Sequence, residues 1–126
     1  MAVSPEEWIR QADYDADTAE YNFKGGRHFY AVFMCHLAVE KALKGILHQR
    51  TGMPPPKGHH LVSLSSQAGL RPPADIMKFL AVLNEIDVTT RYPETLEKMA
   101  RAYPEKKVDE IMKKTREAIA WIKTQL

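Results

Sequence analysis

Apolar residues recur every three or four positions along every long segment of the chain, which is the spacing of one face of an α-helix. The spacing predicts a first helix that begins at Ser4-Pro5 and ends at Gly25-Gly26. No segment shows the sustained two-residue alternation of a β-strand. We therefore expect an all-α fold, an up-and-down bundle of four to five helices plus a short helix, forming one domain over residues 1–126. The helices expected after the first cover residues 27–50, 60–68, 74–88, 94–103 and 105–125.

The first helix has the clearest start signal in the chain. Ser4 fits the N-cap and Pro5 the first helical position, where its missing N–H costs nothing. Glu7 stands where the reciprocal member of a capping box belongs. The following apolar residues lie three or four apart, so this segment should pack one stripe against the rest of the bundle.

The second predicted helix is apolar around more than half of its circumference. Such a helix should be central, packed by neighbours on more than one side or by a second subunit. Glu40 is its only acidic residue, and a partly buried carboxylate needs a partner. His36, four residues away on the same face, Lys44 or a residue from another helix could be that partner. Glu40 is then either part of a structural polar pair or a cleft carboxylate that binds or orients a nucleotide.

Composition narrows the class of protein but not its function. The 126 residues include 18 Lys and Arg against 16 Asp and Glu, a net charge of +2 that neither demands nor forbids a nucleic-acid partner. Cys35 is the only cysteine, which excludes an internal disulfide and suits a reducing compartment; its apolar surroundings favour a core role over a nucleophilic one. The sequence begins without a signal-peptide pattern, and no apolar run approaches the ~18 residues of a membrane span. We expect a cytoplasmic protein with no membrane partner.

The charge is unevenly distributed. Residues 1–26 carry six acids and two bases, residues 27–51 four bases and one acid, and residues 91–126 nine bases and six acids. These segments are either solvated helix faces of differing sign, or the second and last helices contribute to a surface that faces an anion.

The familiar metal and cofactor motifs are missing from the sequence. Asp13, Asp15 and Asp17 imitate the start of a calcium loop, but the glycine of such a loop is absent and Lys24 occupies the position of its bidentate glutamate. There is no glycine-rich phosphate loop and no zinc-binding His-Glu-x-x-His sequence. We therefore expect no metal ion and no cofactor.

Two short segments carry other candidate chemistry. His59-His60 precedes the third helix, which it could cap, or it could lie at the mouth of a site. Arg91-Tyr92 offers a guanidinium that can bind phosphate in two-pronged fashion beside a ring that can stack on a base. Alternatively, Arg91 pairs with a helix C-terminus and Tyr92 fills a gap.

Taken together, these segments of the sequence resemble those of the HEPN domain family. Residues 26–33 and 38–44 resemble the family's second-helix signature, and residues 54–62 and Arg91-Tyr92-Pro93 match the next two landmarks. The resemblance implies a small up-and-down helical bundle that is often dimeric and associates with nucleotides or RNA. It also implies, as a partner, a minimal nucleotidyltransferase in a toxin–antitoxin or defence-type pair.

The resemblance breaks down at the family's catalytic motif. The resemblance implies that active members of the family are metal-independent endoribonucleases, which carry an Arg-x4–6-His motif. In this chain, no histidine follows His60. We therefore expect a non-catalytic homodimeric module that binds nucleotide or RNA, or docks a nucleotidyltransferase. The alternatives are a divergent endoribonuclease in which His60 or His36 substitutes, and a purely structural interaction domain. The candidate binding residues are Arg91 for phosphate, Tyr92 for stacking, Lys44 for positive charge, Glu40 for orienting polar groups, and His60.

Overall fold

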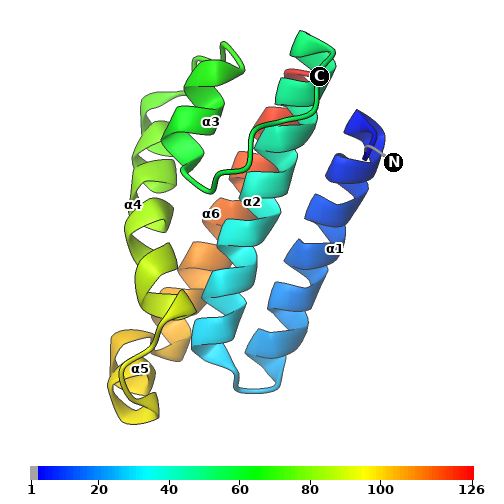
Figure 1. Cartoon of the computed structure of the whole chain (residues 1–126). Coiled ribbons are helices and arrows are strands. Elements are labelled where there is room, and N and C mark those ends of the chain that lie inside the picture. The colour runs from blue at the N-terminus through cyan, green and yellow to red at the C-terminus, as the bar shows by residue number, and fades with distance from the viewer. Residues whose placement is uncertain (1–2) are drawn as a thin grey trace.

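Four long helices lie side by side in the computed structural model, which describes residues 3–126, and a short helix lies near each end of this bundle (Figure 1). α2 is central and packs against α1, α3, α4 and α6. The described residues contain helices and no strands, so the expected all-α bundle is confirmed. The helices are α1 (Pro5–Lys24), α2 (His28–Thr51), α3 (Leu61–Gln67), α4 (Ala74–Arg91), α5 (Leu96–Ala102) and α6 (Glu105–Thr124).

The observed helix bounds differ from the expected ones by three residues or fewer. The largest difference is at α4, which continues to Arg91 and so includes the residue we expected to follow it. Ser4 caps α1 as predicted, because its hydroxyl accepts a hydrogen bond from the backbone N–H of Glu7 at 3.1 Å. The Glu7 carboxylate does not complete the capping box; it binds the Arg10 guanidinium at 3.0 Å instead.

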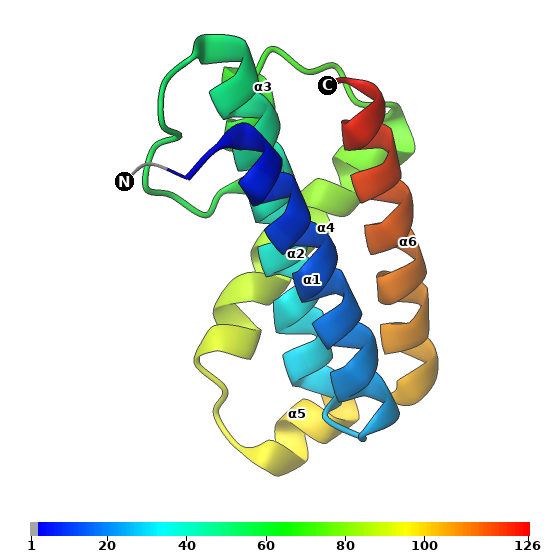
Figure 2. The same ribbon diagram turned by 90° about the vertical axis from the view of Figure 1, so that its right-hand side faces the viewer.

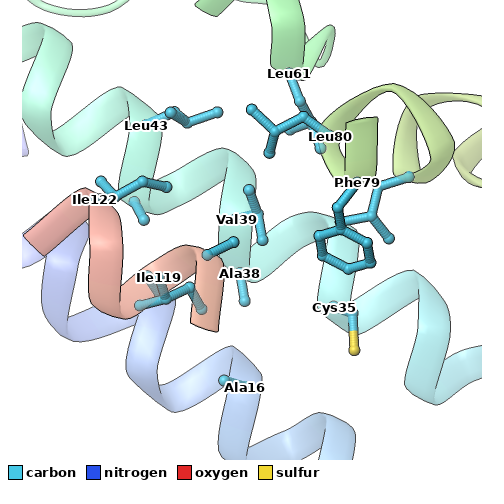
Figure 3. Packing of buried hydrophobic residues seen from close by; sticks show 14 of the residues in the cluster. Ala16, Cys35, Ala38, Val39, Leu43, Leu61, Phe79, Leu80, Ile119 and Ile122 are labelled. Carbon is cyan, nitrogen blue, oxygen red and sulfur yellow. The ribbon is translucent and has the colours of Figure 1, made fainter. Parts of the chain in front are cut away.

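The hydrophobic core lies along α2 and receives side chains from every other helix. Figure 3 shows Val39 and Leu43 of α2 among residues of α3, α4 and α6, with Ala16 of α1 beneath them. α1 contributes mainly alanines to the core, so its backbone comes close to that of α2. Cys35 is buried in the core, as its apolar surroundings predicted.

The uneven charge of the sequence is partly explained by ion pairs between helices. Lys123 of α6 pairs with Asp13 of α1 at 2.8 Å, and Lys41 of α2 pairs with Asp15 of α1 at 2.9 Å. Arg116 of α6 binds both Asp17 and Glu20, each at 2.8 Å. The acidic first helix is therefore matched to basic groups of its two neighbours, with no anionic ligand needed at these positions.

The two ends of the bundle are closed differently. α3 and the loop that leads to it lie at the end that also holds the C-terminus, whereas α5 lies at the opposite end of the bundle, the end of the α1–α2 turn (Figure 2). Within residues 3–126, no helix is both long and apolar enough to cross a membrane.

Candidate functional site

α2 carries a stripe of polar side chains in the middle of an otherwise apolar helix. His36, Glu40 and Lys44 follow one another at intervals of four residues, so they share one face. All three are buried. The same face meets α4 at Asp87, which also pairs with Arg91, four residues further along α4. Together with His59, from the loop before α3, these residues form what we call the α2–α4 polar cluster.

Glu40 is the centre of one half of this cluster. Its Oε2 accepts a hydrogen bond from Lys44 Nζ at 3.1 Å, and its Oε1 lies 2.9 Å from Nδ1 of His59. Nδ1 of His36 lies 3.7 Å from the same Oε1. The Lys44 ammonium also lies 5.8 Å from the centre of the Trp8 ring, at cation–π distance. The buried carboxylate thus has partners from its own helix and from a loop 19 residues away in sequence.

Asp87 occupies the corresponding place in the other half. It is buried, and its Oδ1 accepts a hydrogen bond from the Arg91 guanidinium at 3.1 Å. The same oxygen lies 3.4 Å from Nδ1 of His36. The Arg91 guanidinium lies 5.0 Å from the centre of the Phe33 ring, so it is held by a carboxylate and an aromatic face together.

His36 joins the two halves of the cluster. Its ring lies between the carboxylates of Glu40 and Asp87, yet neither of its nitrogens has a hydrogen-bond partner among the described residues. Burial lowers the pKa of His36 below its usual 6.5, although both carboxylates favour the protonated form and oppose this effect. The imidazole is therefore neutral at neutral pH, and the cluster consists of two ion pairs separated by an uncharged ring.

Among the cluster members, His59 is exposed and Arg91 is partly exposed. The His59 side chain is 58% exposed and that of Arg91 is 29% exposed, whereas those of His36, Glu40 and Lys44 are buried. Each exposed group is anchored on a buried carboxylate, so its orientation is fixed from beneath. This arrangement presents the Arg91 guanidinium, a hydrogen-bond donor, and the Nε2 side of the His59 ring to solvent at defined positions.

The structure brings three of the five sequence-predicted site residues together, namely Glu40, Lys44 and Arg91. His60 lies apart from the cluster contacts, because its Nδ1 accepts a hydrogen bond from the Ser63 N–H at 3.1 Å and so caps α3. Tyr92 is 75% exposed at the end of α4, where it follows Arg91 in sequence but makes none of the described contacts of the cluster.

Sequence reasoning missed Asp87, and of the two adjacent histidines it named His60 as a candidate site residue, whereas His59 is the one that contacts Glu40. Asp87 had a detectable signal, because it lies four residues after Leu83 on the apolar stripe of α4 and four before Arg91. His59 had no such signal in the sequence. The loop that carries it is irregular, and only the path of this loop over α2 brings the His59 ring to Glu40. Within residues 3–126, no three His, Cys, Asp or Glu side chains are arranged to hold a metal ion.

The helix order and the central α2 define a small helical-bundle protein, and comparison with known proteins gives its family. The chain matches the HEPN domain over residues 5–125, so it belongs to the HEPN family. ST0689, an archaeal HEPN homologue of known crystal structure, is 30% identical; the match covers 98% of each chain with a TM-score of 0.77. The expected resemblance is confirmed.

A second solved structure shares the fold at lower identity. TT1696 from Thermus thermophilus is 24% identical, with a TM-score of 0.82, and the match covers 97% of this chain and 98% of that one. At this identity the likeness shows the fold alone. No curated protein sequence matches the chain.

Proposed function

We propose that this chain is a non-catalytic HEPN module that binds a phosphate-bearing ligand, a nucleotide or RNA, at the exposed edge of the α2–α4 polar cluster. The observation that carries the proposal is the anchoring of Arg91 on the buried carboxylate of Asp87, at 3.1 Å. A guanidinium has five N–H donors, and the described bonds to Asp87 use only one of its nitrogens. The remaining donors match the geometry of a phosphate group.

The surroundings of Arg91 support the same proposal. The Phe33 ring packs against the guanidinium and restricts its motion, so less entropy is lost when a ligand binds. Tyr92 is exposed next to Arg91 in sequence and offers a ring on which a base can stack. Glu40 and Lys44 contribute from beneath, Glu40 by holding the exposed His59 ring in place. His60 contributes only indirectly in this proposal, because its side chain caps the start of α3.

Binding measurements on matched arginine variants test this function. Wild type should bind a fluorescently labelled single-stranded RNA or AMP, and the apparent affinity should fall as salt rises. Arg91→Ala should weaken binding about tenfold or more, because hydrogen bonds to charged groups are worth about 1.5–3 kcal/mol. Arg71→Ala, which removes an exposed arginine outside the cluster, is the control and should bind as wild type does. If neither ligand binds wild type, the purely structural alternative replaces the proposal.

One contact favours a second function, that of a divergent metal-independent endoribonuclease. Glu40 Oε1 holds Nδ1 of His59 at 2.9 Å, which leaves Nε2 of an exposed ring free to exchange a proton. A buried carboxylate that orients a histidine in this way is the arrangement used in acid–base catalysis. Arg91 would then hold the scissile phosphate. The histidine that the family motif places after an arginine would be supplied here by the loop before α3.

RNA cleavage in the presence of EDTA separates the two functions. Cleavage by wild type that is lost in both His59→Ala and Arg91→Ala would support the endoribonuclease and contradict the non-catalytic proposal. Binding without cleavage supports the non-catalytic module. His60→Ala is a poor probe here, because His60 caps α3 and its loss disturbs the loop.

We further propose that the module acts in the cytoplasm as a homodimer beside a minimal nucleotidyltransferase. This part rests on membership of the HEPN family, together with the expectations drawn from the sequence. Co-expression with a nucleotidyltransferase encoded by a neighbouring gene should give a complex that survives size-exclusion chromatography. Separate elution of the two proteins at micromolar concentration would contradict this partner.

A further inference from the structure

A groove between α4 and α6 lies outside the α2–α4 polar cluster and has a volume of about 540 Å³. Both helices pack mainly on α2 and meet each other at few positions, so the bundle is open along this side. Apolar side chains line the groove: Ile76, Phe79, Val82, Ile86 and Ile111. Val82, in the middle of α4, is 40% exposed.

Charged side chains of both signs surround this apolar strip. The α4 side contributes Asp75, Lys78 and Glu85, and the α6 side carries two lysines and two glutamates. Three lysines against four acidic residues give almost no net charge. An RNA backbone needs a surplus of basic groups, so this groove is unsuited to the ligand proposed for the cluster. An apolar strip with mixed charges at its edges is typical of a surface that packs against another amphipathic helix.

We propose that the α4–α6 groove is the interface with a second copy of this chain, in which α4 of one copy packs antiparallel to α4 of the other. Lys78, Val82 and Glu85 are spaced four and three residues apart, so they form one seam along α4. With a rise of about 1.5 Å per residue, Lys78 lies about 6 Å before Val82 and Glu85 about 4.5 Å after it. A two-fold axis through Val82 therefore places Lys78 of each copy opposite Glu85 of the other.

This self-complementarity is the reason for choosing a second copy over another protein. A two-fold interface uses the same surface on both subunits, so opposite charges must lie at nearly equal distances from the axis. Lys78 and Glu85 satisfy this condition about the exposed Val82, whereas a groove for an unrelated helix need not. The inference rests on the homodimer part of the proposed function and adds where the two copies meet.

The oligomeric state of valine variants gives the first test. Sedimentation equilibrium of the full chain should give a mass near twice that of the 14.4 kDa chain. Val82→Glu puts a carboxylate of each copy on the two-fold axis, where the two like charges face each other. This change should raise the dimer dissociation constant about tenfold or more. Val88→Glu is the matched control, since Val88 is on the same helix and 65% exposed but does not line the groove. It should leave the dimer intact, and circular dichroism should show both variants folded.

Charge exchange gives a second test that does not depend on Val82. Lys78→Glu and Glu85→Lys should each weaken the dimer, because each places like charges opposite one another twice. An equimolar mixture of the two variants should recover the dimer, since every facing pair is again of opposite charge. Failure of the mixture to recover would overturn the antiparallel pairing.

The remaining outcomes separate this inference from the proposed function. A wild-type dimer that is insensitive to Val82→Glu and to both charge changes overturns the groove interface but leaves the homodimer. A monomer at all concentrations overturns both the interface and the homodimer. Neither result bears on ligand binding at Arg91, which the RNA and AMP titrations measure separately.

Discussion

Oδ1 of Asp87 lies 3.4 Å from Nδ1 of His36, so α2 and α4 meet through a buried carboxylate and a buried imidazole. Arg91 binds the same oxygen from the solvent side. The carboxylate therefore links an interior group to an exposed cation on the proposed ligand surface. Any change in the charge of His36 acts on the partner that holds Arg91 in place.

Stability should depend on pH through His36. In the unfolded chain His36 titrates near 6.5, whereas burial lowers its pKa in the folded protein. Above pH 6.5 both states are neutral and the full stability is present. As the pH falls below 6.5, the unfolded chain takes up a proton first, so the free energy of unfolding decreases until the folded-state pKa is passed.

Urea unfolding at about pH 7.5 and about pH 5.5, on either side of the unfolded-state pKa, measures this loss. His36→Leu keeps a side chain of similar bulk but has no proton to take up, so its free energy of unfolding should fall less between the two pH values. An equal fall in wild type and His36→Leu would mean that other groups account for the acid sensitivity.

Two Glu–Lys pairs with the same i, i+4 spacing should differ strongly in their effect on stability. Glu40–Lys44 is buried, whereas Glu94–Lys98 is exposed. Glu40→Ala leaves the buried Lys44 ammonium without its carboxylate and should lower the free energy of unfolding by about 3–5 kcal/mol. Glu94→Ala removes an exposed pair and should cost less than about 1 kcal/mol. Urea denaturation of both variants makes the comparison; similar losses would contradict the structural role of the buried pair.

The helical fold could be predicted because periodicity is a local property of the sequence. Spacing of apolar residues, together with the Ser4 cap and glycine stops, placed every helix to within three residues. The largest difference, at the end of α4, has a physical reason: Asp87 binds Arg91 one turn later, which stabilises the last turn as far as Arg91.

The candidate site could be predicted only in part. The polarity of Glu40 in an apolar helix, and its i, i+4 neighbours, are visible in the sequence. The proximity of Asp87 and His59 to this part of α2 is not visible in the sequence, because it depends on how α4 and an irregular loop pack against α2. Adjacent residues such as His59 and His60 have the same chemistry, and only the loop path decides which reaches the carboxylate.

Cys35 should be unreactive in the folded protein. Burial raises the pKa of the Cys35 thiol to about 11, so the reactive thiolate is scarce at about pH 8. Iodoacetamide at that pH should alkylate the folded chain very slowly and the urea-unfolded chain quickly, as mass spectrometry can follow. Rapid alkylation without denaturant would show that the thiol is accessible and that this part of the core opens readily.

Gly45 should resist substitution although it lies within a helix, where alanine is normally favoured by about 1 kcal/mol. A Cβ at this position would lie 2.9 Å from Cδ1 of Ile9 and 3.2 Å from the carbonyl oxygen of Pro5, because α1 approaches α2 closely here. Overpacking typically costs about 1–3 kcal/mol, so Gly45→Ala should destabilise the protein by about 1 kcal/mol net, and Gly45→Val by more. Gly58→Ala, with open space around its Cβ, should leave thermal stability almost unchanged. A higher melting temperature for Gly45→Ala would show that α1 can move away from α2 at little cost.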